Sequence, residues 1–315
     1  MGWTMAGPRF RVRQGSGMAT VRRGSAGGLA VLCVLVMAGC GAVPGAGGRD
    51  RLHEQADQAL ARYDRAARAA AAEGFVPVGE LTGQLGDWEP EVGDNDKIAL
   101  LSGNLEAVVA LPPAPSTTGQ VVWPDGTTHP VTLLSAQEAL VQLVTTAGST
   151  DCGGCTTLQV TGAELIERPV ATSRGTAQAP VWAFSLRGTK VRATRLAVRP
   201  EQTVTVTPPP WDPNDPPGGI PVDSATLAPD GITVTVSFVG SPGPASQPCG
   251  ADYTAEPVES DTAVVVIVEE HRAGGEQACT AVGASRTAVA TLSRPLGSRA
   301  VLEVVQGTPV SVTAD

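Results

Sequence analysis

The stretch Ile232-Thr-Val-Thr-Val-Ser-Phe238 alternates apolar and polar residues along its whole length. Successive side chains of a strand point to opposite faces, so its apolar residues would share one buried face while the hydroxyl residues face solvent. The later run Val264–Val268 is apolar throughout and predicts a strand buried on both faces. Turn residues separate further short runs at Val289–Leu292, Ala300–Val305 and Val310–Val312. Residues 220–315 are therefore expected to form a small all-β, sandwich-like domain.

Upstream of this region lies PPPWDPNDPPGG, residues 208–219, with six prolines. Proline lacks the amide hydrogen that a central strand donates, so this stretch predicts a semi-rigid linker between two domains. Trp211 is placed in the middle of it. An aromatic side chain in a linker is expected either to dock the two domains together or to mark a site for a partner.

Residues 50–207 show mixed patterns and predict an α+β domain. A helix is expected from Asp50 to about Glu73, because apolar and small residues recur there at helical spacing. The stretch at residues 98–111, IALLSGNLEAVVAL, also favours a helix. A further helix should begin at Ser135, since Ser135 and Glu138 have the capping-box spacing. Antiparallel strands are expected as a hairpin at 120–133, with the turn Pro124–Thr127, and as a meander at 157–169, 178–187 and 190–198.

Residues 18–39 have the layout of an export signal. Arg22 and Arg23 precede an apolar core that runs from Leu29 to Met37. That core is shorter than the roughly 20 residues needed to cross a bilayer, so we interpret it as a cleavable signal. Met18 stands where such signals usually begin, and residues 1–17 could therefore be a mis-assigned upstream extension.

The ending Met37-Ala38-Gly39-Cys40 resembles the bacterial lipobox. The resemblance implies cleavage before Cys40 and a diacylglycerol group on its thiol. Residues 40–49 are then a lipidated, flexible tether rich in small residues. Two or more acyl chains give stable attachment, and we expect the lipid on Cys40 to be the membrane anchor.

Cysteine usage agrees with export from the cytoplasm. Of the six cysteines, Cys33 lies in the signal and Cys40 is the lipidation candidate. Four cysteines remain, and an even number in an exported chain indicates disulfides, here two. Three pairings are possible, and the local one is favoured for the remaining residues Cys152, Cys155, Cys249 and Cys279.

The charge balance excludes one class of partner. The chain of 315 residues has 22 basic and 31 acidic residues, a net charge of −9. Residues 1–39 hold five of the basic residues and no acidic one, so the 276 residues after cleavage carry a net charge of −14. A nucleic-acid binder needs Lys and Arg gathered on one face to neutralise phosphates. No such basic face is expected here, so a nucleic-acid partner is excluded. A polybasic membrane surface is implausible for the same reason.

The most enzyme-like motif is Cys152-Gly-Gly-Cys155. A redox CxxC needs its first thiol at a helix N-terminus, where the helix dipole lowers the thiol pKa. The residues that follow, TTLQVTG, predict a strand instead. We expect a structural loop disulfide, with a redox role and free or metal-bound thiols as alternatives. A zinc site would need two more ligands, and the histidines His53, His129 and His271 are scattered along the chain.

Oxygen-rich clusters are ambiguous. Asp94-Asn95-Asp96 and Asp212-Pro-Asn214-Asp215 could bind calcium, but neither has EF-hand spacing, and Asp and Asn are ordinary turn residues. Acidic residues gather at Glu256, Glu259, Asp261, Glu269 and Glu270. A solvated sheet face is expected there, with a carboxylate pair for acid–base hydrolysis as the alternative. Without a nucleophile elbow or phosphate-binding loop, we predict no catalytic residue, no metal site and no cofactor.

Several stretches are similar to lipoproteins of high-GC Gram-positive (actinobacterial) bacteria, over most of residues 50–312. They are FVPVGELTGQLGDWEPEVGDNDK, CGGCTTLQVTGAEL, TSRGTAQAPVWAFSL, PPPWDPNDPP, PCGADYTAE and CTAVGASRTAVATLSRPLGSRAVLEV. The resemblance implies an envelope lipoprotein of uncharacterised function and carries over no catalytic residue.

The sequence thus predicts a protein anchored by lipid at the extracytoplasmic face of the cell membrane. Its expected role is non-enzymatic binding of an unknown envelope protein or polymer. The alternative is an envelope enzyme, either a cell-wall hydrolase or a thiol-oxidoreductase. A small-solute-binding lipoprotein is a third reading, but two lobes with parallel sheets would be expected there, and the β-rich second half argues against them.

Overall fold

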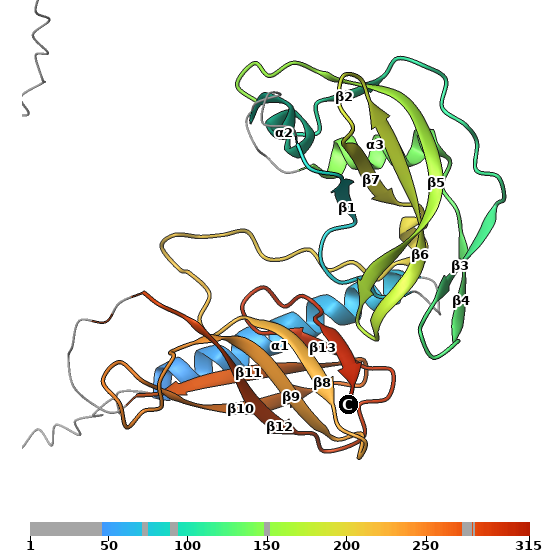
Figure 1. The fold of residues 1–315 in the computed structure, drawn as a ribbon. Coiled ribbons are helices and arrows are strands. Elements are labelled where there is room, and N and C mark those ends of the chain that lie inside the picture. The colour runs from blue at the N-terminus through green and yellow to red at the C-terminus, as the bar shows by residue number, and fades with distance from the viewer. Residues whose placement is uncertain (1–45, 71–74, 89–93, 148–151, 273–278, 280) are drawn as a thin grey trace, which may run out of the picture. The chain divides into compact units, whose positions relative to one another are not determined.

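The computed structural model describes residues 46–70, 75–88, 94–147, 152–272, 279 and 281–315. The described part of the chain is mostly β-sheet, with 41% of its residues in strands and 17% in helices. The strands of the described residues form a seven-stranded, a three-stranded and a four-stranded sheet (Figure 1). A high β content was expected for the second half of the chain, and the first half proves to be rich in strands as well.

The seven-stranded sheet is built around a long hairpin. Its strands are β1 (Thr82–Leu85), β2 (Leu105–Ala107), β3 (Thr118–Val122), β4 (Thr128–Thr132), β5 (Leu158–Thr172), β6 (Gly175–Leu186) and β7 (Arg192–Leu196). Strand β6 pairs antiparallel with β5 and β7, and through one residue pair with β3. The turn between β5 and β6 is closed by Gly175, whose φ of +85° is accessible to glycine at little cost. The predicted β3–β4 hairpin and β5–β6–β7 meander are confirmed.

Two helices contribute to the core of this sheet, α2 (Asp94–Leu101) and α3 (Ala136–Thr146). The capping box predicted for α3 is confirmed: the Glu138 amide donates to Ser135 Oγ at 3.2 Å, and the Ser135 amide donates to the Glu138 carboxylate at 2.8 Å. The prediction of one helix over residues 98–111 is wrong. Helix α2 ends at Leu101, Gly103 adopts a φ of +69°, and the chain continues as strand β2.

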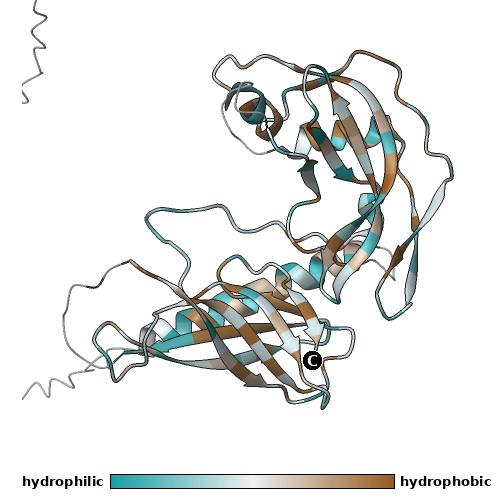
Figure 2. Ribbon diagram, viewed as in Figure 1, coloured by the Kyte–Doolittle hydropathy of each residue, from teal (hydrophilic) through white to brown (hydrophobic). Residues whose placement is uncertain are grey.

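The second half of the chain forms the three-stranded and the four-stranded sheet, here called the C-terminal sheets. The first has the order β10 (Asp252–Glu259), β11 (Ala263–His271), β13 (Ala300–Glu303); the second has the order β12 (Ala284–Thr291), β9 (Thr233–Gly240), β8 (Val222–Leu227), β14 (Ser311–Ala314). They share one apolar core, in which Val234, Val236 and Phe238 of β9 lie with Val264, Val266 and Val268 of β11. The alternation predicted for β9 is confirmed, and Figure 2 shows hydrophobic and hydrophilic bands alternating along these strands.

Helix α1 (Ala46–Ala69) covers the opposite face of the three-stranded sheet (Figure 1). Ala59, Leu60 and Tyr63 of the helix share a buried cluster with Val265 and Ile267 of β11. Residues 264–268 are therefore buried on both faces, as predicted.

The start and the packing of α1 differ from expectation. The helix begins at Ala46, four residues before the expected start at Asp50, so its first turn lies within the segment assigned to a flexible tether. The helix was also expected to belong to the domain at residues 50–207, whereas its buried face contacts strands of the C-terminal sheets. The alanines on its buried face allow the helix to lie close to the valines of the sheet, although the two are about 200 residues apart in sequence.

Candidate functional site

The loop between Cys152 and Cys155 was the leading candidate for chemistry. The two cysteines lie at disulfide distance, with their Cα atoms 5.3 Å apart. The loop is a tight turn in which the Cys155 amide donates to the Cys152 carbonyl at 2.9 Å. Gly153 and Gly154 have φ angles of +52° and +86°, values that favour glycine over other residues. The glycines between the cysteines are thus explained by the turn itself.

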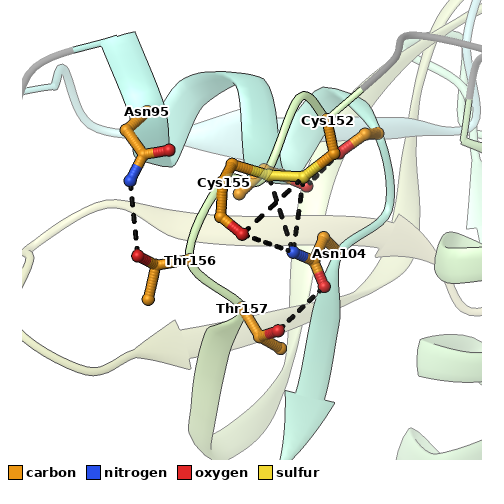
Figure 3. The surroundings of a disulfide bond; sticks show 8 residues. Asn95, Asn104, Cys152, Cys155, Thr156 and Thr157 are labelled. Atoms are coloured by element: carbon orange, nitrogen blue, oxygen red, sulfur yellow. Dashed lines mark hydrogen bonds between the residues drawn. A yellow bond between two sulfur atoms is a disulfide. The ribbon is translucent and has the colours of Figure 1, made fainter.

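Asn104 holds this loop in place (Figure 3). Its Nδ2 atom donates to the Cys155 carbonyl at 3.2 Å and lies 3.4 Å and 3.5 Å from the two sulfur atoms. Its Oδ1 atom accepts a hydrogen bond from the Thr157 hydroxyl at 3.0 Å. The amide side chain therefore ties the start of strand β2 to the entry of strand β5, which pair in parallel from Leu105 and Leu158 onward.

The chain that follows the motif is strand β5, as predicted from its sequence. A redox CxxC gains its low thiol pKa from the helix that begins at its first cysteine, and the motif here does not begin a helix. The geometry favours a disulfide that fixes the loop leading into β5. The motif was visible in the sequence, but the role of Asn104 in holding the loop was not. The only signal for Asn104 was its position directly after Gly103, where Asn is a common turn residue.

The second pair, Cys249 and Cys279, also lies at disulfide distance, with Cα atoms 5.6 Å apart. Both pairs follow the local pairing favoured by the sequence. A cavity of about 300 Å³ lies beside this disulfide. It is lined by the end of β9 and the end of β11, and its charged side chains are Glu270 and Arg272.

The charged groups of this cavity are engaged with each other and with Tyr253. Glu270 accepts hydrogen bonds from Arg272 and from the Tyr253 hydroxyl. These bonds, the one from Arg272 foremost, lower the pKa of Glu270 below its ordinary value. The Tyr253 hydroxyl in turn accepts from the Ser241 amide, and the Arg286 guanidinium stacks on the Tyr253 ring at 5.2 Å. A carboxylate held ionised in this way is a poor proton donor, so Glu270 does not suit the role of a general acid.

The acidic cluster, expected to be a solvated sheet face, is partly exposed and is ion-paired throughout. Each of the five carboxylates lies within ion-pair distance of an arginine: Glu256 and Glu269 with Arg49, Glu270 with Arg272, Asp261 with Arg294, and Glu259 with Arg299. Glycoside hydrolysis needs two carboxyl groups that face a substrate with different pKa values. Carboxylates that each face an arginine do not form such a pair.

The candidate metal ligands are not brought together. His53 of α1 lies 3.3 Å from Glu256, and His271 of β11 shares a hydrogen bond with Thr254, so each contacts a side chain of β10. Across the described ranges, no group of three or more His, Cys, Asp or Glu side chains could hold a metal ion. The Asp94–Asp96 cluster forms the first turn of α2.

The second oxygen-rich cluster is a turn that is fixed to α1. The Asn214 amide donates to Asp212 Oδ1 at 2.8 Å, and the Asp215 amide donates to the Asp212 carbonyl at 3.2 Å. Asp215 then pairs with Arg51 of α1 at 2.5 Å. Trp211 directly precedes this turn, and its side chain is 70% exposed. Trp211 belongs to none of the three apolar clusters, and a partner site at this residue stays a prediction.

The lipidation candidate Cys40, the signal and the tether before Ala46 lie outside the described residues. Of the helices that the structure describes, none combines the length and the apolar character needed to span a bilayer. Comparisons of this chain with protein-family models, with curated proteins and with solved structures found no match.

Proposed function

We propose that this protein is a lipoprotein anchored through Cys40 at the extracytoplasmic face of the cell membrane, where its folded part binds an envelope protein or polymer. The observation that carries the proposal is the sequence Met37-Ala38-Gly39-Cys40 at the end of a short apolar segment with a basic start. Two cysteine pairs at disulfide distance support an oxidising compartment.

The proposal includes an organisation in two domains, an α+β domain at residues 50–207 and a sandwich-like domain at 220–315. Separate apolar clusters support it, since the core around β6 and the core between the C-terminal sheets share no residue. The proline-rich residues 208–219 lie between the two in sequence. Helix α1 belongs to the second unit by its contacts, although it precedes the first in the chain.

The anchor is tested by expressing the full chain in a bacterial host that processes lipoproteins. Mass spectrometry of the N-terminal peptide should find Cys40 as the first residue, carrying diacylglycerol. The protein should sediment with membranes and stay there at high salt, because acyl chains insert irrespective of ionic strength. A Cys40→Ala variant should lose the lipid. An unmodified cysteine in membrane-bound protein would refute the proposal.

The binding role needs its own experiment. Wild-type and Cys40→Ala protein, both affinity-tagged, would be incubated with solubilised envelope fractions and cross-linked. An envelope protein or polymer recovered reproducibly with the wild type, and depleted when untagged folded protein is added as competitor, supports the role. Hydrolysis of purified cell wall, or thiol–disulfide exchange that depends on Cys152, would replace it with one of the enzymatic alternatives.

A further inference from the structure

The first turns of α1 are fixed to one end of the C-terminal sheets. Arg49 pairs with Glu256 of β10 at 2.8 Å and with Glu269 of β11 at 3.0 Å. Two residues later, Arg51 pairs with Asp215 at 2.5 Å and donates to the Pro216 carbonyl at 2.7 Å. We call this end, where β11 finishes and α1 begins, the tether end.

The three most exposed large apolar side chains of the described residues are Trp211, Val239 and Val282, with exposed fractions of 70%, 63% and 62%. Trp211 precedes the turn at Asp212–Asp215, whose ends are less than about 7 Å apart, so it lies close to the Arg51–Asp215 pair. This places Trp211 at the tether end.

Val239 and Val282 lie at the same end. Val239 is the penultimate residue of β9, and the amide of Ser241, two residues later, donates to the Tyr253 hydroxyl. Tyr253 of β10 pairs with Glu270 of β11. Glu270 is next to Glu269, the residue that binds Arg49. A Cβ atom built on Gly283 would lie 2.5 Å from Val239 Cγ1, so the Val239 side chain rests on the backbone beside Val282. The two valines are therefore near neighbours, and both line the cavity beside the Cys249–Cys279 disulfide.

The chain that leads to the proposed anchor is short. Five residues separate Cys40 from the start of α1 at Ala46. Even fully extended, the six steps from Cys40 to Ala46 span only about 20 Å. Arg51 follows after a further five helical residues, about 7.5 Å. A lipid on Cys40 thus keeps the tether end within reach of the headgroups and leaves little room for another protein between them.

We propose that the tether end rests on the phospholipid bilayer, with Trp211, Val239 and Val282 in the headgroup–acyl interface; this rests on the proposed lipidation of Cys40. Tryptophan favours that region because its ring is apolar while its N–H remains hydrogen-bonded. Arg49 and Arg51 are already ion-paired with protein carboxylates, so the contact depends on apolar side chains and not on attraction to anionic lipids.

Depth-dependent fluorescence quenching tests this contact. Lipidated full-length protein and its Trp211→Phe variant would be reconstituted in phosphatidylcholine vesicles, with and without lipids brominated near the headgroup end of the acyl chains. The difference between the two proteins isolates the emission of Trp211. We expect that emission to shift to shorter wavelength and to be quenched by the brominated lipids, with little change on adding salt.

A matched pair of variants tests the location of the contact. In the Trp211→Phe background, Val282→Trp places a fluorophore at the tether end. Val289→Trp places one near the far end of strand β12, at an exposed position (56%) seven residues further along. Quenching is expected for Val282→Trp and not for Val289→Trp. Equal quenching of both, or of neither, would overturn the proposed orientation.

The outcomes separate the two proposals. Mass spectrometry that finds no lipid on Cys40 refutes the anchor before any fluorescence is measured. A lipidated protein whose Trp211 emits at a water-like wavelength and is not quenched leaves the anchor intact and overturns the bilayer contact. Trp211 emission that shifts only when envelope proteins are added would assign this side chain to a protein partner, which also overturns the proposal.

Discussion

Loss of the ion pair between Arg299 and Glu259 should destabilise the C-terminal sheets strongly. The pair is the most buried of those in the described residues, with side chains 4% and 16% exposed and an N–O distance of 2.6 Å. The Arg299 guanidinium also donates to the carbonyls of Arg294, Pro295 and Leu296 at 2.9, 3.1 and 3.3 Å. One side chain therefore closes the loop between β12 and β13 and binds it to the end of β10.

The expected loss in the free energy of unfolding depends on the buried group that each substitution leaves without its partner. Removing one partner of a buried pair costs about 3–5 kcal/mol because the other charge stays buried without compensation. For Arg299→Met we expect about 3 kcal/mol, the lower limit, because Glu259 still accepts from the Ser293 amide at 2.7 Å and has some contact with water. Glu259→Gln keeps a neutral oxygen that can accept from Ser293 and Arg299, and the Arg299 charge retains its three carbonyl acceptors, so this substitution should cost less, about 1–2 kcal/mol.

The pH dependence gives a second test of the same pair. Partial burial of Glu259 would raise its pKa, but hydrogen bonds from the Ser293 amide and from Arg299 outweigh this effect and lower the pKa below its ordinary value. A carboxylate with a lowered folded-state pKa stabilises the fold above the ordinary carboxyl pKa, about 4.3, and loses that stabilisation as the pH falls through the folded value. The deficit of Glu259→Gln should therefore shrink in acid.

Urea unfolding followed by far-ultraviolet circular dichroism would measure these changes. Hydrogen exchange of the β11 amides should accompany it, because the chain has more than one core and a single unfolding transition is not assured. If Arg299→Met lowers the free energy of unfolding by less than about 1 kcal/mol, this substitution does not leave Glu259 as an uncompensated buried charge, and the reasoning above is wrong. A Glu259→Gln deficit that is constant with pH would contradict the assigned pKa direction.

Three further predictions concern local features. Substituting Cys249 by Ser opens a link of sequence separation 30 and should cost about 4 kcal/mol, against about 2 kcal/mol for Cys152 with separation 3, as measured by urea unfolding of the oxidised proteins. Gly103→Ala should cost more than about 1 kcal/mol, because φ is +69° and the new Cβ would lie 2.6 Å from the Ala147 side chain. A variant that unfolds thermally at the same temperature as the wild type would contradict this. Ser135→Ala should cost about 1 kcal/mol through loss of the α3 cap, with faster hydrogen exchange limited to the first turn of that helix.

Local patterns predicted the strands well. The alternation around Val236 and the apolar run at Val264–Val268 each report directly on which faces of one strand are buried. The capping box at Ser135 was equally visible because its two residues lie three apart. Residues 98–111 were misread, since apolar runs of this length suit a helix or a strand, and the deciding feature was the left-handed conformation of Gly103.

Partners distant in sequence could not be predicted. The run at Val264–Val268 indicates a covering layer on each side, but nothing in it identifies α1, about 200 residues earlier, as one of the layers. Arg299, which neutralises Glu259, lies 40 residues downstream, so nothing in the sequence indicated that the acidic cluster has arginine partners. The Cys152–Cys155 loop was visible from spacing, whereas its support by Asn104 depends on the parallel pairing of β2 with β5.

The packing of α1 has a mechanical consequence for the proposed anchor. A helix that lies loosely on a domain can detach when its end is pulled, and it then acts as an extension of the tether. Leu60 and Tyr63 of α1 are 6% and 3% exposed against β11, and each fully buried side chain of this kind contributes about 1.5–3 kcal/mol. Peeling α1 from the sheet would also expose Val265 and Ile267 to water. The helix therefore stays with its sheet, and the chain between this fixed helix and a lipid on Cys40 is limited to the five residues before Ala46.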